Sequence, residues 1–101
     1  MEIRDILVEL TKLGIHPSMH YDIDMNQCYL DLNTQAKSHL YLYEDGILRG
    51  RYQYQTEIDF NDDIEHMITI LCNVFKRSLC GRDYGNPTWA ELCDSKGIKY
   101  N

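Results

Sequence analysis

The segment that most restricts the fold is residues 39–54, in which leucines alternate with tyrosines and arginines around an Asp45-Gly46 pair. Alternation with a period of two is typical of a β-strand with one buried face. An Asp-Gly pair between two such runs predicts a hairpin. The two strands would then present leucines on one side and tyrosines with arginines on the other.

The register of this hairpin follows from the same alternation. A two-residue loop would place Leu42 opposite Arg49. A three-residue loop ending at a left-handed Gly46 instead pairs Leu42 with Leu48 and Tyr41 with Arg49. A slip of one residue moves every side chain of a strand to the other face, so a buried face selects one register. The three-residue loop is predicted, because it keeps the apolar and polar side chains apart.

Helical periodicity precedes and follows the strands. Residues 2–13 place apolar side chains at helical spacing, and Gly14 predicts the end of that helix. Residues 61–80 form the strongest helical pattern, with Asn61 as the expected N-cap. A short third helix is expected to start at Asn86-Pro87.

Two further alternating runs, residues 18–23 and 28–33, raise the expected number of strands to four. The chain is therefore predicted to be a single α+β domain, residues 1–101, with an N-terminal helix, a four-stranded antiparallel sheet, a long helix and a short C-terminal helix. The helices should lie mainly on one sheet face. Against them we expect Leu30, Leu32, Leu40, Leu42, Leu48 and Tyr52, and facing away from them His20, Tyr29, Asp31, Tyr41, Tyr43, Arg49 and Arg51.

Charge and cysteine usage restrict the class of protein. The net charge of −6 opposes non-specific attraction to the phosphates of nucleic acid. The four cysteines contain no Cys-x-x-Cys pair, which favours reduced thiols in a cytoplasmic protein. The N-terminal residues do not resemble a signal peptide, and no apolar run approaches the ~20 residues that span a membrane.

The outward-facing tyrosines and arginines are the best candidates for a partner-binding site. They are Tyr29, Tyr41, Tyr43, Arg49 and Arg51. Such residues suit protein interfaces, because each combines a large contact area with a polar tip. The same types also make ordinary cross-strand pairs. They could instead bind single-stranded nucleic acid, with rings stacking on bases and arginines on phosphates, although the net charge disfavours it.

A second candidate is an acidic patch formed by Glu44, Asp45, Asp59, Asp62 and Asp63. Carboxylates at a helix N-terminus stabilise the helix by interacting with its dipole. The alternative is a docking patch, or a surface that imitates the phosphates of DNA.

No motif for catalysis, metal binding or a cofactor is present, so we expect a non-enzymatic protein with no metal and no cofactor. His16 and His20 are separated by Pro17, and adding Cys28 or His39 gives no zinc spacing. Trp89 is expected either to anchor the last helix on the core or, beside Arg82 and Tyr84, to form a partner-binding edge.

Three features occur together in this chain: the opening Met1–Leu7 helix, the tyrosine-rich hairpin, and the closing residues Gly81-Arg82, Trp89, Leu92-Cys93 and Gly97-Ile98. In these features the chain resembles small accessory proteins of phages and prophages of Gram-positive bacteria. The resemblance implies a setting inside a bacterial host cell and not an activity. The partner expected in that setting is a host or phage protein. Anti-CRISPR proteins, which imitate DNA to inhibit a nuclease, are similar in layout only.

The sequence therefore predicts an accessory protein that binds and modulates another protein through its tyrosine-arginine sheet face. Nucleic-acid binding through the same face and self-association through an open strand edge remain alternatives.

Overall fold

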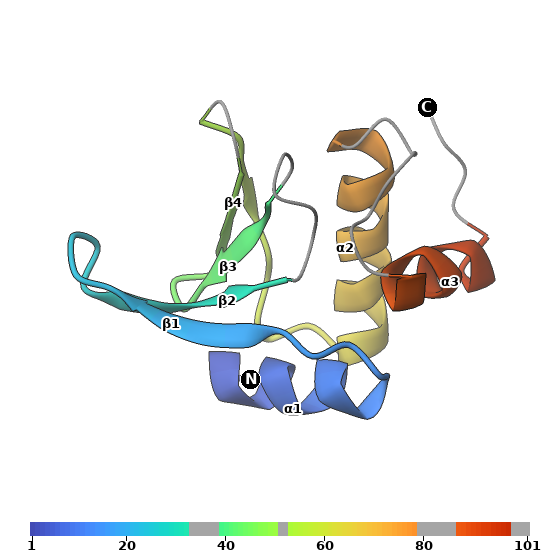
Figure 1. The fold of residues 1–101 in the computed structure, drawn as a ribbon, viewed down its shortest axis with the longest axis horizontal. Helices are drawn as coiled ribbons and strands as arrows, with labels where there is room; N and C mark the ends of the chain where they lie inside the picture. Colours follow the sequence, from blue (N-terminus) through green and yellow to red (C-terminus); the bar gives the residue numbers. More distant parts are fainter. Residues whose placement is uncertain (33–38, 51–52, 79–86, 98–101) are drawn as a thin grey trace.

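The computed structural model describes residues 1–32, 39–50, 53–78 and 87–97 (Figure 1). The elements follow in the order α1 (Ile3–Lys12), β1 (Ser18–Asp22), β2 (Gln27–Asp31), β3 (Tyr41–Tyr43), β4 (Ile47–Arg49), β5 (Gln55–Glu57), α2 (Ile64–Ser78) and α3 (Pro87–Ser95). The strands form one antiparallel sheet in sequence order. The α+β class is thus confirmed, but the sheet has five strands where the sequence predicted four.

The additional strand arises because the second strand of the predicted hairpin, expected to run to Tyr54, ends at Arg49, and a further strand begins at Gln55. β4 ends at Arg49, the N–H of Gly50 donates a 3.0 Å hydrogen bond to the carbonyl of Tyr54, and Gln53 has a φ of 61°. The chain reverses here, and β5 pairs with β4. The prediction was wrong because alternation of side chains continues across a tight turn. The predicted site residue Arg51 and the predicted core residue Tyr52 lie outside the described residues.

The predicted hairpin register is confirmed. Leu42 pairs with Leu48 and Tyr41 pairs with Arg49. Gly46 has a φ of 86°, which a glycine adopts without a Cβ clash, and its N–H donates to the carbonyl of Tyr43. The carbonyl of Gly46 accepts a 2.7 Å hydrogen bond from the N–H of Ile58, so the same turn also holds the chain that follows β5.

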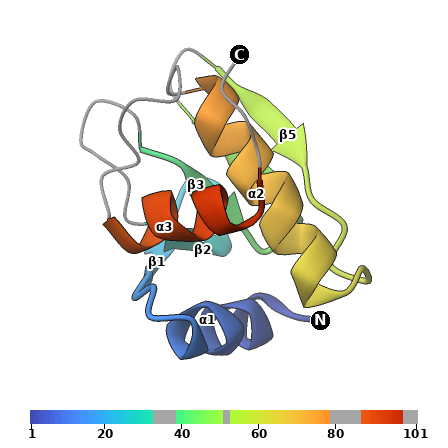
Figure 2. The ribbon, with the colours of Figure 1, turned by 90° about the vertical axis from the view of Figure 1, so that its right-hand side faces the viewer.

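The helices cover one side of the sheet. Figure 1 shows α1 along β1 and β2, and Figure 2 shows α2 and α3 packed together in front of the strands. The predicted core leucines are all buried on this side: Leu30, Leu32, Leu40, Leu42 and Leu48. Among the described residues, no helix has the length and apolarity needed to cross a membrane.

Trp89 anchors α3 to this core. Its side chain has no exposed surface, and its ring centroid lies 4.4 Å from that of Phe75. The indole N–H donates a 2.7 Å hydrogen bond to the carbonyl of Leu32, just beyond β2. Of the two roles considered for Trp89, the structure supports the anchor. Arg82 and Tyr84 lie outside the described residues.

The ends of the first two helices follow capping rules, although the start of α2 was misplaced. The N–H of Ile15 donates to the carbonyl of Leu10, and Gly14 is left-handed with a φ of 85°, as the sequence predicted for the end of α1. α2 begins at Ile64, and the carboxylate that accepts a first-turn N–H belongs to Asp63. The expected N-cap Asn61 belongs to the preceding turn.

Candidate partner-binding face

The sheet side opposite the helices carries a row of stacked rings. His20 of β1 pairs with Tyr29 of β2, and Tyr29 pairs with Tyr43 of β3, so the three side chains are cross-strand neighbours on one face. The His20 and Tyr29 centroids are 5.4 Å apart, and those of Tyr29 and Tyr43 are 5.0 Å apart. The rings are inclined by 28° and 23°, which is the stacked arrangement.

A second pair of rings adjoins this row. Tyr41 and Tyr29 form a T-shaped pair at a centroid distance of 5.4 Å, and His39 stacks on Tyr41 at 5.6 Å. His39 Nδ1 lies 3.3 Å from a carboxylate oxygen of Asp31. Burial raises the pKa of Tyr41, and the charge of Asp31 raises it further. We call the set formed by His20, Tyr29, His39, Tyr41, Tyr43 and Arg49 the aromatic face.

Arg49 of β4 lies at the end of the row, next to Tyr43. Its guanidinium carbon lies 4.4 Å from the centroid of Tyr43, a cation–π distance. The carboxylate of Asp45 accepts two hydrogen bonds from this guanidinium, at 3.0 and 3.3 Å, and another from the amide of Gln27 at 3.1 Å. Burial raises the pKa of Asp45, but the bonds from Arg49, the Ile47 N–H and Gln27 together lower it. Arg49 is therefore held in place by the hairpin loop itself.

Tyr43 is the most buried ring of the aromatic face, with 8% of its surface exposed. Its hydroxyl donates a 2.6 Å hydrogen bond to the carboxylate of Asp22 on β1. Burial, followed by this hydrogen bond, raises the pKa of Tyr43 to about 12. The same bond is the main cause that lowers the pKa of Asp22. Tyr43 thus ties β3 to β1 and is chiefly a support for the rings beside it.

Four of the five predicted site residues come together on this face, namely Tyr29, Tyr41, Tyr43 and Arg49. Sequence reasoning left out two members. His20 was expected on the same face but was not included in the site, and His39 was not considered for it. Both could have been found from the strand period, because His39 stands two positions before Tyr41 and His20 was expected on the same sheet face as Tyr29.

The predicted acidic residues mostly serve local structure. Asp59 and Asp63 accept hydrogen bonds from the N–H groups of Asn61 and His66, and Asp62 bonds to the His66 ring. Asp45 is engaged by Arg49. These four carboxylates therefore stabilise turns, a helix start and the aromatic face. The fifth predicted member, Glu44, lines a pocket.

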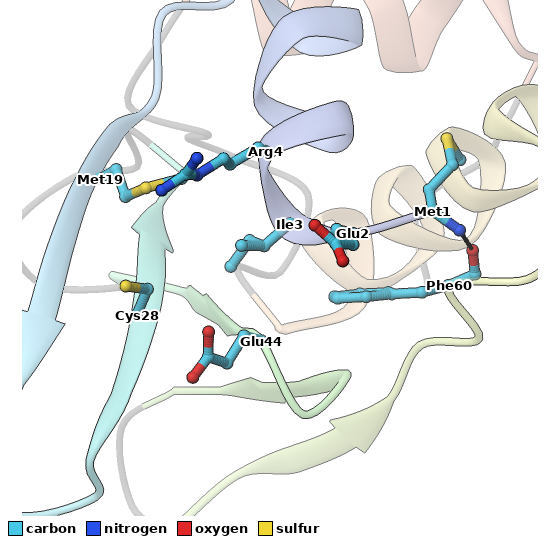
Figure 3. A pocket seen from close by; sticks show the side chains of 8 residues that line it. All are labelled: Met1, Glu2, Ile3, Arg4, Met19, Cys28, Glu44 and Phe60. Carbon is cyan, nitrogen blue, oxygen red and sulfur yellow. Dashed lines mark hydrogen bonds between the residues drawn. The ribbon is translucent and has the colours of Figure 1, made fainter.

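That pocket, of about 400 Å³, opens on the helix side of the sheet (Figure 3). Ile3 and Phe60 supply apolar wall, and Figure 3 shows the Glu44 carboxylate and the Arg4 guanidinium on opposite sides of it. The complete lining is Met1, Glu2, Ile3, Arg4, Met19, Cys28, Glu44 and Phe60. The pocket combines apolar surface with charges of both signs, and it shares no residue with the aromatic face.

The described part of the chain contains no group of three or more His, Cys, Asp or Glu side chains that could hold a metal ion. Cys28 is a half-buried free thiol, and Cys72 and Cys93 are buried. Cys80 lies outside the described residues.

Comparison of the chain with protein-family models, with curated proteins and with solved structures finds no match. The class is therefore defined by the fold and the face alone. It is an α+β domain whose antiparallel sheet is packed against helices on one side and carries an aromatic surface on the other.

Proposed function

We propose that this protein is a non-enzymatic binding module that docks another protein on its aromatic face. The observation that carries the proposal is the continuous set of stacked rings on the sheet side that the described helices leave uncovered. Tryptophan, tyrosine and arginine are enriched among the few residues that contribute most of the binding energy at protein interfaces. Tyr29, Tyr41 and His39 are half-buried by one another and keep part of their surface open to a partner.

The rings are organised before a partner arrives. Tyr29 is stacked between His20 and Tyr43, and Arg49 is fixed by Asp45. Ordering a mobile side chain on binding costs about 0.5–1.5 kcal/mol. Because the surrounding contacts already restrict these side chains, much of that cost is avoided.

The charge around the rings indicates the chemistry of the partner. Asp22, Asp31 and Asp45 adjoin the rings, and the whole chain carries a net charge of −6. A lysine or arginine side chain can contact a tyrosine ring through cation–π attraction and reach a neighbouring carboxylate. The proposed partner is therefore a protein segment that presents basic side chains.

Nucleic acid fits this face less well. A phosphate would have to displace Asp45 from the guanidinium of Arg49, where two hydrogen bonds hold it. The excess of carboxylates also repels a polyanion. A phage or host protein as the partner, and modulation of that partner, are predictions that rest on the sequence resemblance alone.

The proposal is tested by capture followed by measurement of affinity. The immobilised chain is exposed to nuclease-treated lysate of a Gram-positive bacterium, and a retained protein is identified, purified and titrated by calorimetry. Wild type is compared with Tyr41→Ala, with Tyr41→Phe, which keeps the ring, and with the control Val8→Ala. Val8 is an exposed apolar residue of α1, on the helix side.

We expect Tyr41→Ala to weaken binding by about tenfold or more, as the loss of an interface hot spot does, and the two other variants to bind nearly as wild type. Circular dichroism establishes that each variant is folded. Equal affinity in all four proteins would overturn the assignment of the face. Capture that disappears on nuclease treatment would replace the protein partner with nucleic acid.

A further inference from the structure

Among the described strands, β1 forms an open edge of the sheet, because β2 alone of them pairs with it. The hydrogen bonds of β2 show which backbone N–H and C=O groups of β1 point to the open edge. The carbonyl of Cys28 bonds toward β3, so the next residue, Tyr29, bonds toward β1 and its partner His20. Because these directions alternate along a strand, Met19 and Tyr21 turn their N–H and C=O groups to the open edge.

Apolar side chains lie exposed along the same edge. Tyr21 is 54% exposed, and Ile23, in the turn after β1, is 84% exposed. Figure 1 shows this β1–β2 hairpin extending away from the helices. An extended edge with exposed apolar side chains is a template for pairing with another strand.

We propose that β1 pairs antiparallel with β1 of a second copy of this chain, about a twofold axis that passes beside Tyr21. In this register Tyr21 faces Tyr21 of the other copy, and the two residues exchange both backbone hydrogen bonds. Met19 meets Ile23 of the other copy on the helix side of the sheet. His20 meets Asp22 on the opposite side, which adds a pair of complementary polar groups at each end.

Neighbouring registers are less favourable. An axis at Asp22 would bring two carboxylates face to face, and like charges directly opposite destabilise a sheet. An axis at His20 would place Ile23 opposite Pro17, which has no N–H to donate. The register centred on Tyr21 avoids both faults and covers the two most exposed apolar side chains of the described residues.

Such a dimer would join two sheets into one. Side chains directly opposite each other on antiparallel strands project to the same side of a sheet. The aromatic faces of both copies would therefore lie on one surface. The interface involves only a few residues of each copy, and contacts of this size are weak. Dimerisation is therefore expected only at high protein concentration.

On a twofold axis, a residue faces the identical residue of the second copy, and the test uses this property. Sedimentation velocity is recorded over about a hundredfold range of concentration, spanning the weak-binding regime. The proteins are wild type, Tyr21→Lys, Tyr21→Glu, and an equal mixture of these two variants. Gln55→Lys on β5, an exposed residue at the other edge of the sheet, is the control.

We expect wild type and Gln55→Lys to approach twice the 11.9 kDa of one chain at the highest concentration. Each Tyr21 variant alone should stay at the mass of one chain, because two like charges meet on the axis. The mixture should recover the double mass, because the charges are then opposite. A wild-type protein that stays at one chain mass, or a dimer that only Gln55→Lys abolishes, would overturn the proposal.

Discussion

The hydroxyl of Tyr43 on β3 donates a 2.6 Å hydrogen bond to the carboxylate of Asp22 on β1. These strands are not neighbours, since β2 lies between them. The bond therefore spans three strands and passes beside Tyr29, whose ring stacks on Tyr43. It connects the stability of the sheet with the rigidity of the aromatic face.

Removing this hydroxyl is expected to destabilise the protein. Tyr43→Phe keeps the ring stacked but loses the hydrogen bond, which should lower the free energy of unfolding by about 1 kcal/mol. Urea unfolding measures the change. Tyr41→Phe is the matched control, because within the aromatic face the Tyr41 hydroxyl donates no hydrogen bond to a described side chain. Its effect on the free energy of unfolding should be smaller. Equal losses in the two variants would contradict the role given to the Tyr43–Asp22 bond.

The same bond predicts a stability change at alkaline pH. The pKa of Tyr43 rises from 10.0 to about 12 on folding, so the fold favours the neutral phenol. The stability that this contributes is fully present below pH 10 and is lost as the pH rises toward 12. In urea unfolding, the advantage of wild type over Tyr43→Phe should therefore shrink between these two pH values. A stability difference between wild type and Tyr43→Phe that grows with pH would contradict this prediction.

Gly46 and Gly97 form a matched pair for testing the hairpin turn. Both are left-handed, with φ values of 86° and 67°. A Cβ on Gly46 would lie 2.8 Å from the backbone carbonyl oxygen of Ile58, whereas a Cβ on Gly97 would meet nothing within 4 Å. Gly97→Ala should cost about 1 kcal/mol of backbone strain, and Gly46→Ala should cost more because of the added clash. Chemical denaturation of both variants checks this order, and a smaller loss at Gly46 would contradict it.

Because Trp89 anchors α3, even its replacement by another aromatic residue should lower the free energy of unfolding by a large amount. Trp89→Phe retains an aromatic ring but leaves the Leu32 carbonyl without its indole donor and opens space beside Phe75. We expect a loss of about 2–3 kcal/mol in the free energy of unfolding, measured by urea denaturation followed by circular dichroism. Val8→Ala, on the exposed side of α1, should change stability by less than about 0.5 kcal/mol. A Trp89→Phe variant as stable as this control would contradict the anchor role of Trp89.

Much of the fold could be predicted because its signals are local. The pairing of Leu42 with Leu48 follows from alternation together with one glycine, and both residues are buried as expected. The turn after Arg49 was missed, because the alternation runs through it unchanged. Gly50 was the available signal, since a glycine within a strand pattern often marks a bend.

The candidate face was predictable in part. Strand periodicity placed Tyr29, Tyr41 and Arg49 on one side of the sheet, where the structure has them. It could not assign their contacts. The stacking of Arg49 on Tyr43 and the bond from Tyr43 to Asp22 depend on the twist of the sheet and on side-chain rotamers, which a period of two does not encode.

The sequence by itself determined the α+β class, the buried leucines, the hairpin register and the end of α1, because each depends on periodicity or on the backbone freedom of one glycine. The tertiary structure decided which side chains of the aromatic face support it and which remain open. It also decided that Trp89 is buried and that, among the described strands, β2 alone pairs with β1. These properties depend on contacts between residues far apart in the chain, and only the packed fold brings those residues together.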